Sequence, residues 1–96
     1  MGEAKALNRK EDGCYLCGSH EMMERHHIFP SRANRKLSEK YADCCCVWLC
    51  HKHHNTPNGV HYRKQLRQYF QAMAQAKFEE KYGRELFLQE FKKNYI

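Results

Sequence analysis

Eighteen residues near the middle of this 96-residue chain contain four cysteines and four histidines. They run from Cys44 to His61, and the apolar run at their start ends abruptly at Leu49. Cys50 and His53 are separated by two residues, which is the ligand spacing of a zinc knuckle. Because two ligands do not complete a tetrahedral site, this segment needs a second pair elsewhere in the chain.

The second pair is Cys14 and Cys17, which has the same spacing and is followed by Gly18. A glycine at this position suits the tight backbone of a knuckle, where a positive φ is often required. Taken alone, a C-x-x-C pair could also be a redox pair, although such pairs usually open a helix in a larger α/β fold. Together the two pairs predict one structural Zn²⁺ site with four ligands: Cys14, Cys17, Cys50 and His53.

The chain is long enough for one small domain, and a bound metal would add stability that so short a chain often lacks. The sequence contains no run of about 18 apolar residues, so we expect no membrane span. Residues 1–12, which we expect to form a loose arm, lack the apolar centre of a signal peptide. We therefore expect a cytoplasmic protein, in which the six cysteines are metal ligands or free thiols rather than disulfides.

The chain carries 17 lysines and arginines against 11 aspartates and glutamates, which is a formal net charge of +6. This excess favours a polyanionic partner, most simply nucleic acid, although ordinary solubility is an alternative explanation. Several basic side chains lie in residues 31–43, a connection expected to be a loop with one helical turn near residues 35–41. Basic side chains next to a histidine cluster could position phosphates, or they could simply be solvated.

Two short strands are expected on either side of this connection, at residues 26–30 and 44–49. Neighbouring side chains of a strand point to opposite faces, so His26 and His27 cannot share one role. One could bind a metal while the other faces a substrate; alternatively, both lie on the surface. In the second strand, packing is favoured over metal ligation for three small thiols: Cys44, Cys45 and Cys46.

Helices are expected in the remainder of the chain. A short helix covers residues 50–55, and a longer one begins near Val60 after a loop at residues 57–59. The longer helix carries an apolar stripe that we interpret as core, formed by Tyr62, Leu66, Tyr69, Phe70 and Met73. Gly83 is expected to end this helix. A last helix at residues 84–92 then presents three apolar side chains: Leu86, Phe87 and Phe91.

Among the histidines outside the zinc site, four are candidates for a second site: His26, His27, His54 and His61. A divalent ion held by two or three imidazoles, with positions open to water and phosphate, forms a hydrolytic site. A neutral histidine beside such an ion can accept a proton from water near pH 7. These residues therefore favour the hydrolysis of a phosphodiester.

The order Cys14-x-x-Cys17, His26-His27-Ile28, Leu49-Cys50-x-x-His53-His54 resembles the HNH (ββα-metal) nuclease superfamily. It is most similar to small bacterial and phage-type members with a zinc-knuckle pair, and the resemblance covers about residues 14–61. It implies a small α+β fold of the treble-clef-like ββα-metal type, and a phage- or prophage-related endonuclease that cleaves DNA with a metal ion. Residues 13–61 would be the nuclease core, and residues 62–96 a helical extension packed on it within a single domain.

By the same resemblance, His27 is the general base, and His26 and His54 bind the catalytic ion, with His61 as a further candidate ligand. The ion would be Zn²⁺, Ni²⁺, Mn²⁺ or Mg²⁺, although Mg²⁺ needs more oxygen ligands than the sequence offers. Basic residues near the histidines would position the phosphates of DNA: Arg32, Arg35, Lys36, Arg63 and Lys64.

Two departures from the family pattern leave an alternative open. The middle asparagine of the family lies near the position of Cys45, and the glycines common after the histidine doublet are replaced by Pro30-Ser31-Arg32. The chain could therefore be a catalytically inactive, zinc-stabilised nucleic-acid-binding or recombination accessory module. The basic charge beside the histidines argues against a third hypothesis, a zinc-stabilised protein-interaction domain.

Overall fold

The structure is a computed structural model that describes residues 5–29 and 32–96. Its antiparallel sheet has two strands, β1 (Met23–His27) and β2 (Cys46–Cys50), with His27 paired opposite Cys46. Both predicted strands are present but shifted along the sequence. β1 begins three residues before His26 and stops at His27, and β2 begins two residues after Cys44 and continues to Cys50. The expected end of the first strand, at Pro30, lies outside the described residues.

The segment between the strands is helical, where a loop with a single turn was predicted. Helix α1 spans Arg32–Lys40, and α2 spans Ala42–Cys45. α1 packs on the core through Leu37 and the fully buried Ser38. The prediction that Cys44 and Cys45 lie in a strand is wrong, because both belong to α2. Their small thiols pack equally well in either backbone conformation, so the surrounding core decides between helix and strand.

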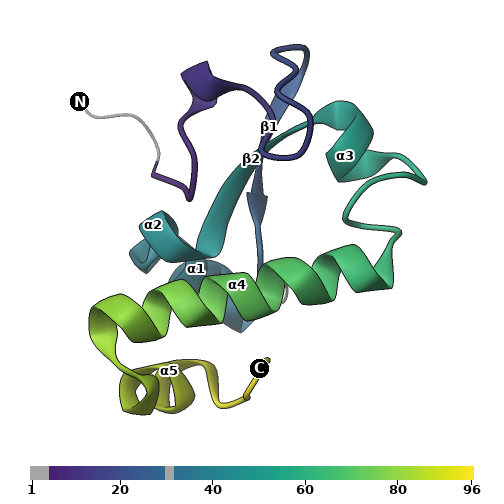
Figure 1. Cartoon of the computed structure of the whole chain (residues 1–96). Coiled ribbons are helices and arrows are strands. Elements are labelled where there is room, and N and C mark those ends of the chain that lie inside the picture. Colours follow the sequence, from purple (N-terminus) through teal and green to yellow (C-terminus); the bar gives the residue numbers. More distant parts are fainter. Residues whose placement is uncertain (1–4, 30–31) are drawn as a thin grey trace.

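Helix α3 (His51–Asn55) follows β2 directly, close to the predicted range. The long helix α4 (Lys64–Tyr82) begins four residues after Val60 and ends just before Gly83, as expected, and α5 (Arg84–Phe91) follows. Figure 1 shows α4 running across the molecule below the sheet, with α5 packed beneath it. None of the helices in the described part of the chain is long and apolar enough to cross a membrane. The chain is thus a small α+β protein.

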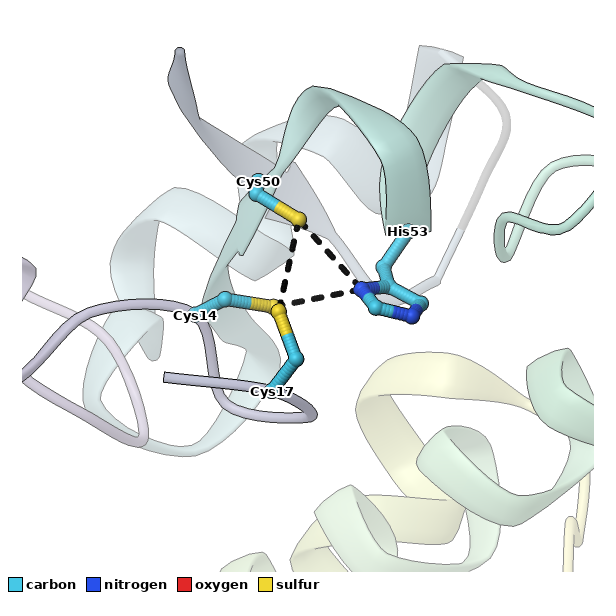
Figure 2. Close-up of side chains that lie close together, drawn as sticks. All are labelled: Cys14, Cys17, Cys50 and His53. Carbon is cyan, nitrogen blue, oxygen red and sulfur yellow. Dashed lines mark hydrogen bonds between the residues drawn. The ribbon is translucent and has the colours of Figure 1, made fainter. Parts of the chain in front are cut away.

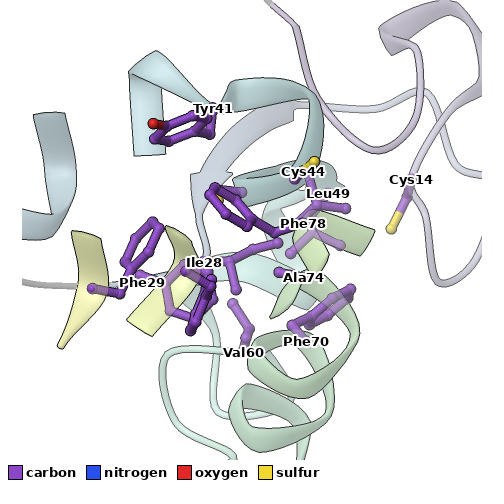
Figure 3. Packing of buried hydrophobic residues seen from close by; sticks show 14 of the residues in the cluster. Cys14, Ile28, Phe29, Tyr41, Cys44, Leu49, Val60, Phe70, Ala74 and Phe78 are labelled. Atoms are coloured by element: carbon purple, nitrogen blue, oxygen red, sulfur yellow. The ribbon is translucent and has the colours of Figure 1, made fainter. Parts of the chain in front are cut away.

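One continuous hydrophobic core joins the sheet to the C-terminal helices (Figure 3). On α4 the fully buried apolar positions are Phe70, Ala74 and Phe78, spaced four residues apart. This face differs from the predicted stripe, because Tyr62 and Tyr69 are 66% and 53% exposed. Periodicity identified the helix, but the position of the sheet decides which of its aromatic side chains are buried.

Helix α5 completes this core. Phe87 and Phe91 are buried and Leu86 is half-buried, as predicted. The ring of Phe29, which follows β1, lies 5.7 Å from that of Phe87 and 4.9 Å from that of Phe91. Aromatic pairs at these distances stabilise beyond their buried area. This packing anchors the chain two residues after His27 and so helps to define the position of that histidine.

The N-terminal segment, predicted to be a loose arm, contacts the free edge of β2 through Leu7 and Asn8. The Leu7 N–H donates to the carbonyl of Cys46 at 2.7 Å. The Asn8 side chain continues this pairing, because its Oδ1 accepts from the Trp48 N–H at 2.8 Å and its Nδ2 donates to the Trp48 carbonyl at 3.2 Å. A short 3₁₀ helix, η1 (Lys10–Asp12), leads from there to the first knuckle.

Candidate metal centre and histidine cavity

The four predicted zinc ligands, Cys14, Cys17, Cys50 and His53, point toward one another (Figure 2), and their ligand atoms all lie within 4.8 Å. His53 Nδ1 is 3.3 Å from Cys50 Sγ and 3.7 Å from Cys14 Sγ. The sulfurs of Cys17 and Cys50 are 3.8 Å apart. Zinc bonds of about 2.0 Å to nitrogen and 2.3 Å to sulfur give a tetrahedron with edges of about 3.5 Å between nitrogen and sulfur and about 3.8 Å between sulfurs. The cluster is therefore compatible with a structural zinc ion.

Local backbone geometry shapes the first knuckle around the sulfur of Cys14. Gly18 adopts the expected positive φ, at 78°, and its N–H donates to the Cys14 carbonyl at 2.8 Å. The Leu16 N–H points at Cys14 Sγ from 3.4 Å. Burial raises the pKa of Cys14, but backbone N–H groups around the sulfur outweigh this effect and lower it overall. The knuckle thus favours the thiolate form, which is the form that binds metal.

A second cluster joins His26 from β1, His54 from α3 and His61 from the loop before α4. The Nε2 atoms of His54 and His61 are 2.8 Å apart, and the ring centroid of His26 lies 5.0 and 5.1 Å from theirs. Burial, together with the neighbouring imidazoles, lowers the pKa of His26 to about 3, and burial also lowers that of His61. Neutral imidazoles carry the lone pair that binds a divalent ion, so this histidine triad is a candidate metal site.

His61 reaches the histidine triad because the loop after α3 turns back onto that helix. The N–H groups of Val60 and His61 donate to the carbonyls of His53 and His54, at 2.8 and 3.3 Å. A Cβ atom at Gly59 would lie only 2.8 Å from backbone carbons of His53 and His54, so any side chain there would force the loop away. The loop thus rests on one ligand of each cluster and couples their positions.

Glu24 orients the histidines of α3. Its carboxylate accepts hydrogen bonds from His54 Nδ1 at 2.6 Å, His51 Nδ1 at 3.1 Å and Asn55 Nδ2 at 2.9 Å. Burial raises the pKa of Glu24, but these hydrogen bonds outweigh it and lower the pKa overall. A carboxylate on one nitrogen of a ligand histidine leaves the other available to metal. Sequence reasoning missed Glu24, although strand alternation places it on the same face as His26.

His27 lies next to the histidine triad but is not one of its members. Its Nε2 donates to the carboxylate of Glu39, which lies on α1. The same carboxylate accepts two hydrogen bonds from Arg25, at 2.7 and 3.1 Å. Together, Arg25 and His27 lower the pKa of Glu39 to about 2. Sequence reasoning missed Glu39 because no local pattern links it to a histidine 12 residues earlier.

One cavity of about 440 Å³ brings these groups together, lined by Arg25, His26, His27, Phe29, Arg32, Arg35, His54 and His61. Only two of the five predicted phosphate-binding residues line this cavity. Arg32 and Arg35 line the cavity, whereas Lys36, Arg63 and Lys64 are exposed and lie outside its lining. Imidazole and guanidinium groups in one cavity can bind a divalent ion and a phosphate side by side.

The three consecutive cysteines are free and buried, as the packing interpretation expects. Burial raises the pKa of Cys44 to about 11 and that of Cys46 to about 12. Both are therefore thiols near neutral pH. Cys46 forms a third group of ligand-type atoms with His27 and Glu39, but a thiol that holds its proton this firmly would have to lose it before binding metal.

Comparisons with known proteins found no relative of this chain. The chain matches no model of a protein family, no curated protein and no solved structure. Its Cys₃His cluster within a small α+β fold is compatible with a zinc-binding domain.

Proposed function

We propose that the chain is a metal-dependent endonuclease of the HNH (ββα-metal) type that hydrolyses phosphodiester bonds in DNA. The observation that carries this proposal is the histidine cavity, whose lining combines three converging imidazoles, a fourth histidine and three guanidinium groups. The chain order β1, β2, α3 also supports it, since His26 lies on β1 and His54 on α3. The Cys₃His cluster would hold α3 in place, because Cys50 and His53 lie at its start and within it.

The histidines and two of the arginines that line the cavity would have different tasks. His26, His54 and His61 would hold a divalent ion, which supplies positive charge next to the phosphate oxygens. Arg32 and Arg35 would hold phosphates of the DNA through charge-assisted hydrogen bonds. His27, next to the histidine triad but outside it, would be the general base.

Hydrolysis then requires one proton acceptor and one leaving group. The oxygen of a water molecule bonds to phosphorus while His27 accepts one of the two water protons. The bond between phosphorus and one ester oxygen breaks, and that oxygen takes up a proton to become a hydroxyl group. The products are a phosphate monoester end and an alcohol end, and His27 returns its proton to solvent.

A plasmid-nicking assay tests the proposed activity. Supercoiled plasmid should become nicked or linear when Mg²⁺, Mn²⁺, Ni²⁺ or Zn²⁺ is added to the purified protein, and EDTA should stop the reaction. The variant His27→Ala, purified in the same way, controls for a contaminating nuclease, because its expected loss of activity is not restored by added metal. A wild-type protein that binds duplex DNA but cuts it with none of these ions would contradict the proposal and favour the zinc-stabilised binding module.

DNA binding is expected to be electrostatic and largely independent of sequence. The chain has a net charge of +6, and exposed Arg32 and Arg35 line the proposed site. Affinity for unrelated duplexes should be similar and should fall steeply with salt, because each neutralised phosphate releases about 0.9 counterion. Arg35→Ala should reduce the slope of log K against log[salt] by about 1.

Fluorescence anisotropy with labelled duplexes between about 50 and 200 mM salt measures this slope. Lys93→Ala is the matched control, because Lys93 is an exposed cation outside the cavity lining. Binding that does not depend on salt, or no binding at low salt, would count against a nucleic-acid partner.

A further inference from the structure

We propose that Glu39 is the positioning residue of His27, and that it leaves Nδ1 as the ring nitrogen that receives the proton from water. The catalytic part of this role rests on the function proposed above, whereas the contact between the two side chains does not. Glu39 was not among the predicted site residues, because it lies on helix α1, where mostly loop was expected.

Glu39 is held in place by more than its contact with His27. Both terminal nitrogens of Arg25 donate to its carboxylate, at 2.7 and 3.1 Å. Arg25 is itself anchored, because its Nε donates to the carbonyl of Lys5 at 3.0 Å and its side chain is only 16% exposed. A bidentate guanidinium defines the plane of a carboxylate. The carboxylate therefore presents a defined oxygen to His27 Nε2.

The backbone explains why these three side chains meet. Arg25 and His27 are two residues apart on β1, so they project from the same face of the strand. Glu39 lies near the end of α1, which is fixed to the core by the fully buried Ser38 and by Leu37. A helix packed in this way provides the rigid support that a positioned site residue requires.

The hydrogen bond determines which nitrogen of His27 can act as a base. When one ring nitrogen donates its proton to a partner, the other carries the lone pair of the neutral imidazole. Nε2 donates to Glu39, and His27 lines the cavity, so Nδ1 is the nitrogen left to accept a proton there. A carboxylate partner also stabilises the imidazolium that forms when the proton arrives. Glu24 and Glu39 would thus orient a ligand histidine and the base histidine, respectively.

Steady-state cleavage kinetics with three variants test this role. Glu39→Ala removes the carboxylate, Glu39→Asp keeps it on a shorter side chain, and Asp43→Ala is the control. Asp43 also forms a helix-borne ion pair, with Lys81, but it does not line the histidine cavity. Glu39→Ala should lower kcat by about 10- to 100-fold with KM for DNA unchanged, Glu39→Asp should recover part of the loss, and Asp43→Ala should cleave at the wild-type rate. An unchanged kcat in Glu39→Ala, or a rise in KM alone, would overturn the proposal.

A second readout does not depend on cleavage. In NMR spectra of ¹⁵N-labelled protein, the His27 Nε2–H proton should resonate downfield and exchange slowly with water, because it is held by a carboxylate. The variant His27→Gln identifies this signal. The signal should persist in Asp43→Ala and disappear in Glu39→Ala. A wild-type spectrum without it, or a signal that survives in Glu39→Ala, would overturn the contact itself.

The two readouts separate failure of the positioning role from failure of the proposed function. A wild-type protein that shows the protected signal but cuts no DNA would refute the nuclease function and support the contact between Glu39 and His27. Thermal melting checks that each variant folds. Should Glu39→Ala not fold, Glu39→Gln takes its place, because a neutral amide of similar size cannot accept from Arg25 and His27 as a carboxylate does.

Discussion

Cys50→Ala is expected to unfold the domain and to abolish zinc binding at the Cys₃His cluster. Cys50 ends β2, and its sulfur lies 3.3 Å from His53 Nδ1. Apparent binding energies of structural zinc in small domains are about 10–16 kcal/mol, whereas whole domains are typically stable by only about 5–15 kcal/mol. A site with three of its four ligands loses much of this energy. The cooperative melting transition followed by circular dichroism should therefore disappear, and zinc content should fall by one ion per chain.

Cys44→Ala is the matched control for this prediction. Cys44 is also a buried cysteine, 3% exposed, but its sulfur is not part of the Cys₃His cluster. Its replacement should leave zinc content unchanged and cost about 1 kcal/mol, as the loss of one small apolar group does. A Cys50→Ala protein with the zinc content and melting temperature of the wild type would exclude a structural metal at this cluster.

His27→Ala is expected to bind metal and DNA normally and to cleave about 10²- to 10⁴-fold more slowly, the usual contribution of a positioned general base. The reason is its separation from the histidine triad. The buried His26 lies against His54 and His61, whereas the partly exposed His27 contacts Glu39 on the other face of the strand. Single-turnover cleavage of a labelled duplex, measured against metal concentration, separates loss of the base from loss of the ion.

Substitution of His26, the residue before His27, should have a different effect, because His26 is proposed to bind the ion rather than to accept a proton. His26→Ala should weaken binding of the catalytic ion, so that added Mn²⁺ or Ni²⁺ restores part of the rate, and His54→Ala should resemble it. His61→Ala tests whether the third imidazole is a ligand. His20→Ala is the control, because His20 is exposed and outside the cavity lining. Cleavage by His27→Ala at the wild-type rate would refute the proposed mechanism.

The Cys₃His cluster could be predicted from the sequence because ligand spacing is a local property. Two residues between Cys14 and Cys17, and between Cys50 and His53, bring each pair within reach of one ion. Each pair then needs the other to complete a tetrahedron. The positive φ of Gly18 was predictable for the same reason, since it belongs to the turn of a single knuckle.

Only one turn of helix α1 was predicted, because its only apolar residues are Ala33 and Leu37 and its stability comes from packing. No local pattern therefore indicated that Glu39 lies beside His27. Cys44 and Cys45 illustrate the same limit, since residues of high strand preference form a helix where the core requires one.

The sequence by itself thus determined the residues of the Cys₃His cluster, the order of most elements and the presence of further histidines near the knuckles. Only the tertiary structure decided the surroundings of those histidines, including the bond from His54 to Glu24, 30 residues away, and that from His27 to Glu39, 12 residues away. The physical reason is the distance along the sequence over which each feature is determined. Knuckle spacing and helical periodicity are encoded within a few neighbouring residues, whereas the partner of each ring nitrogen depends on how β1, α1 and α3 pack around a common core.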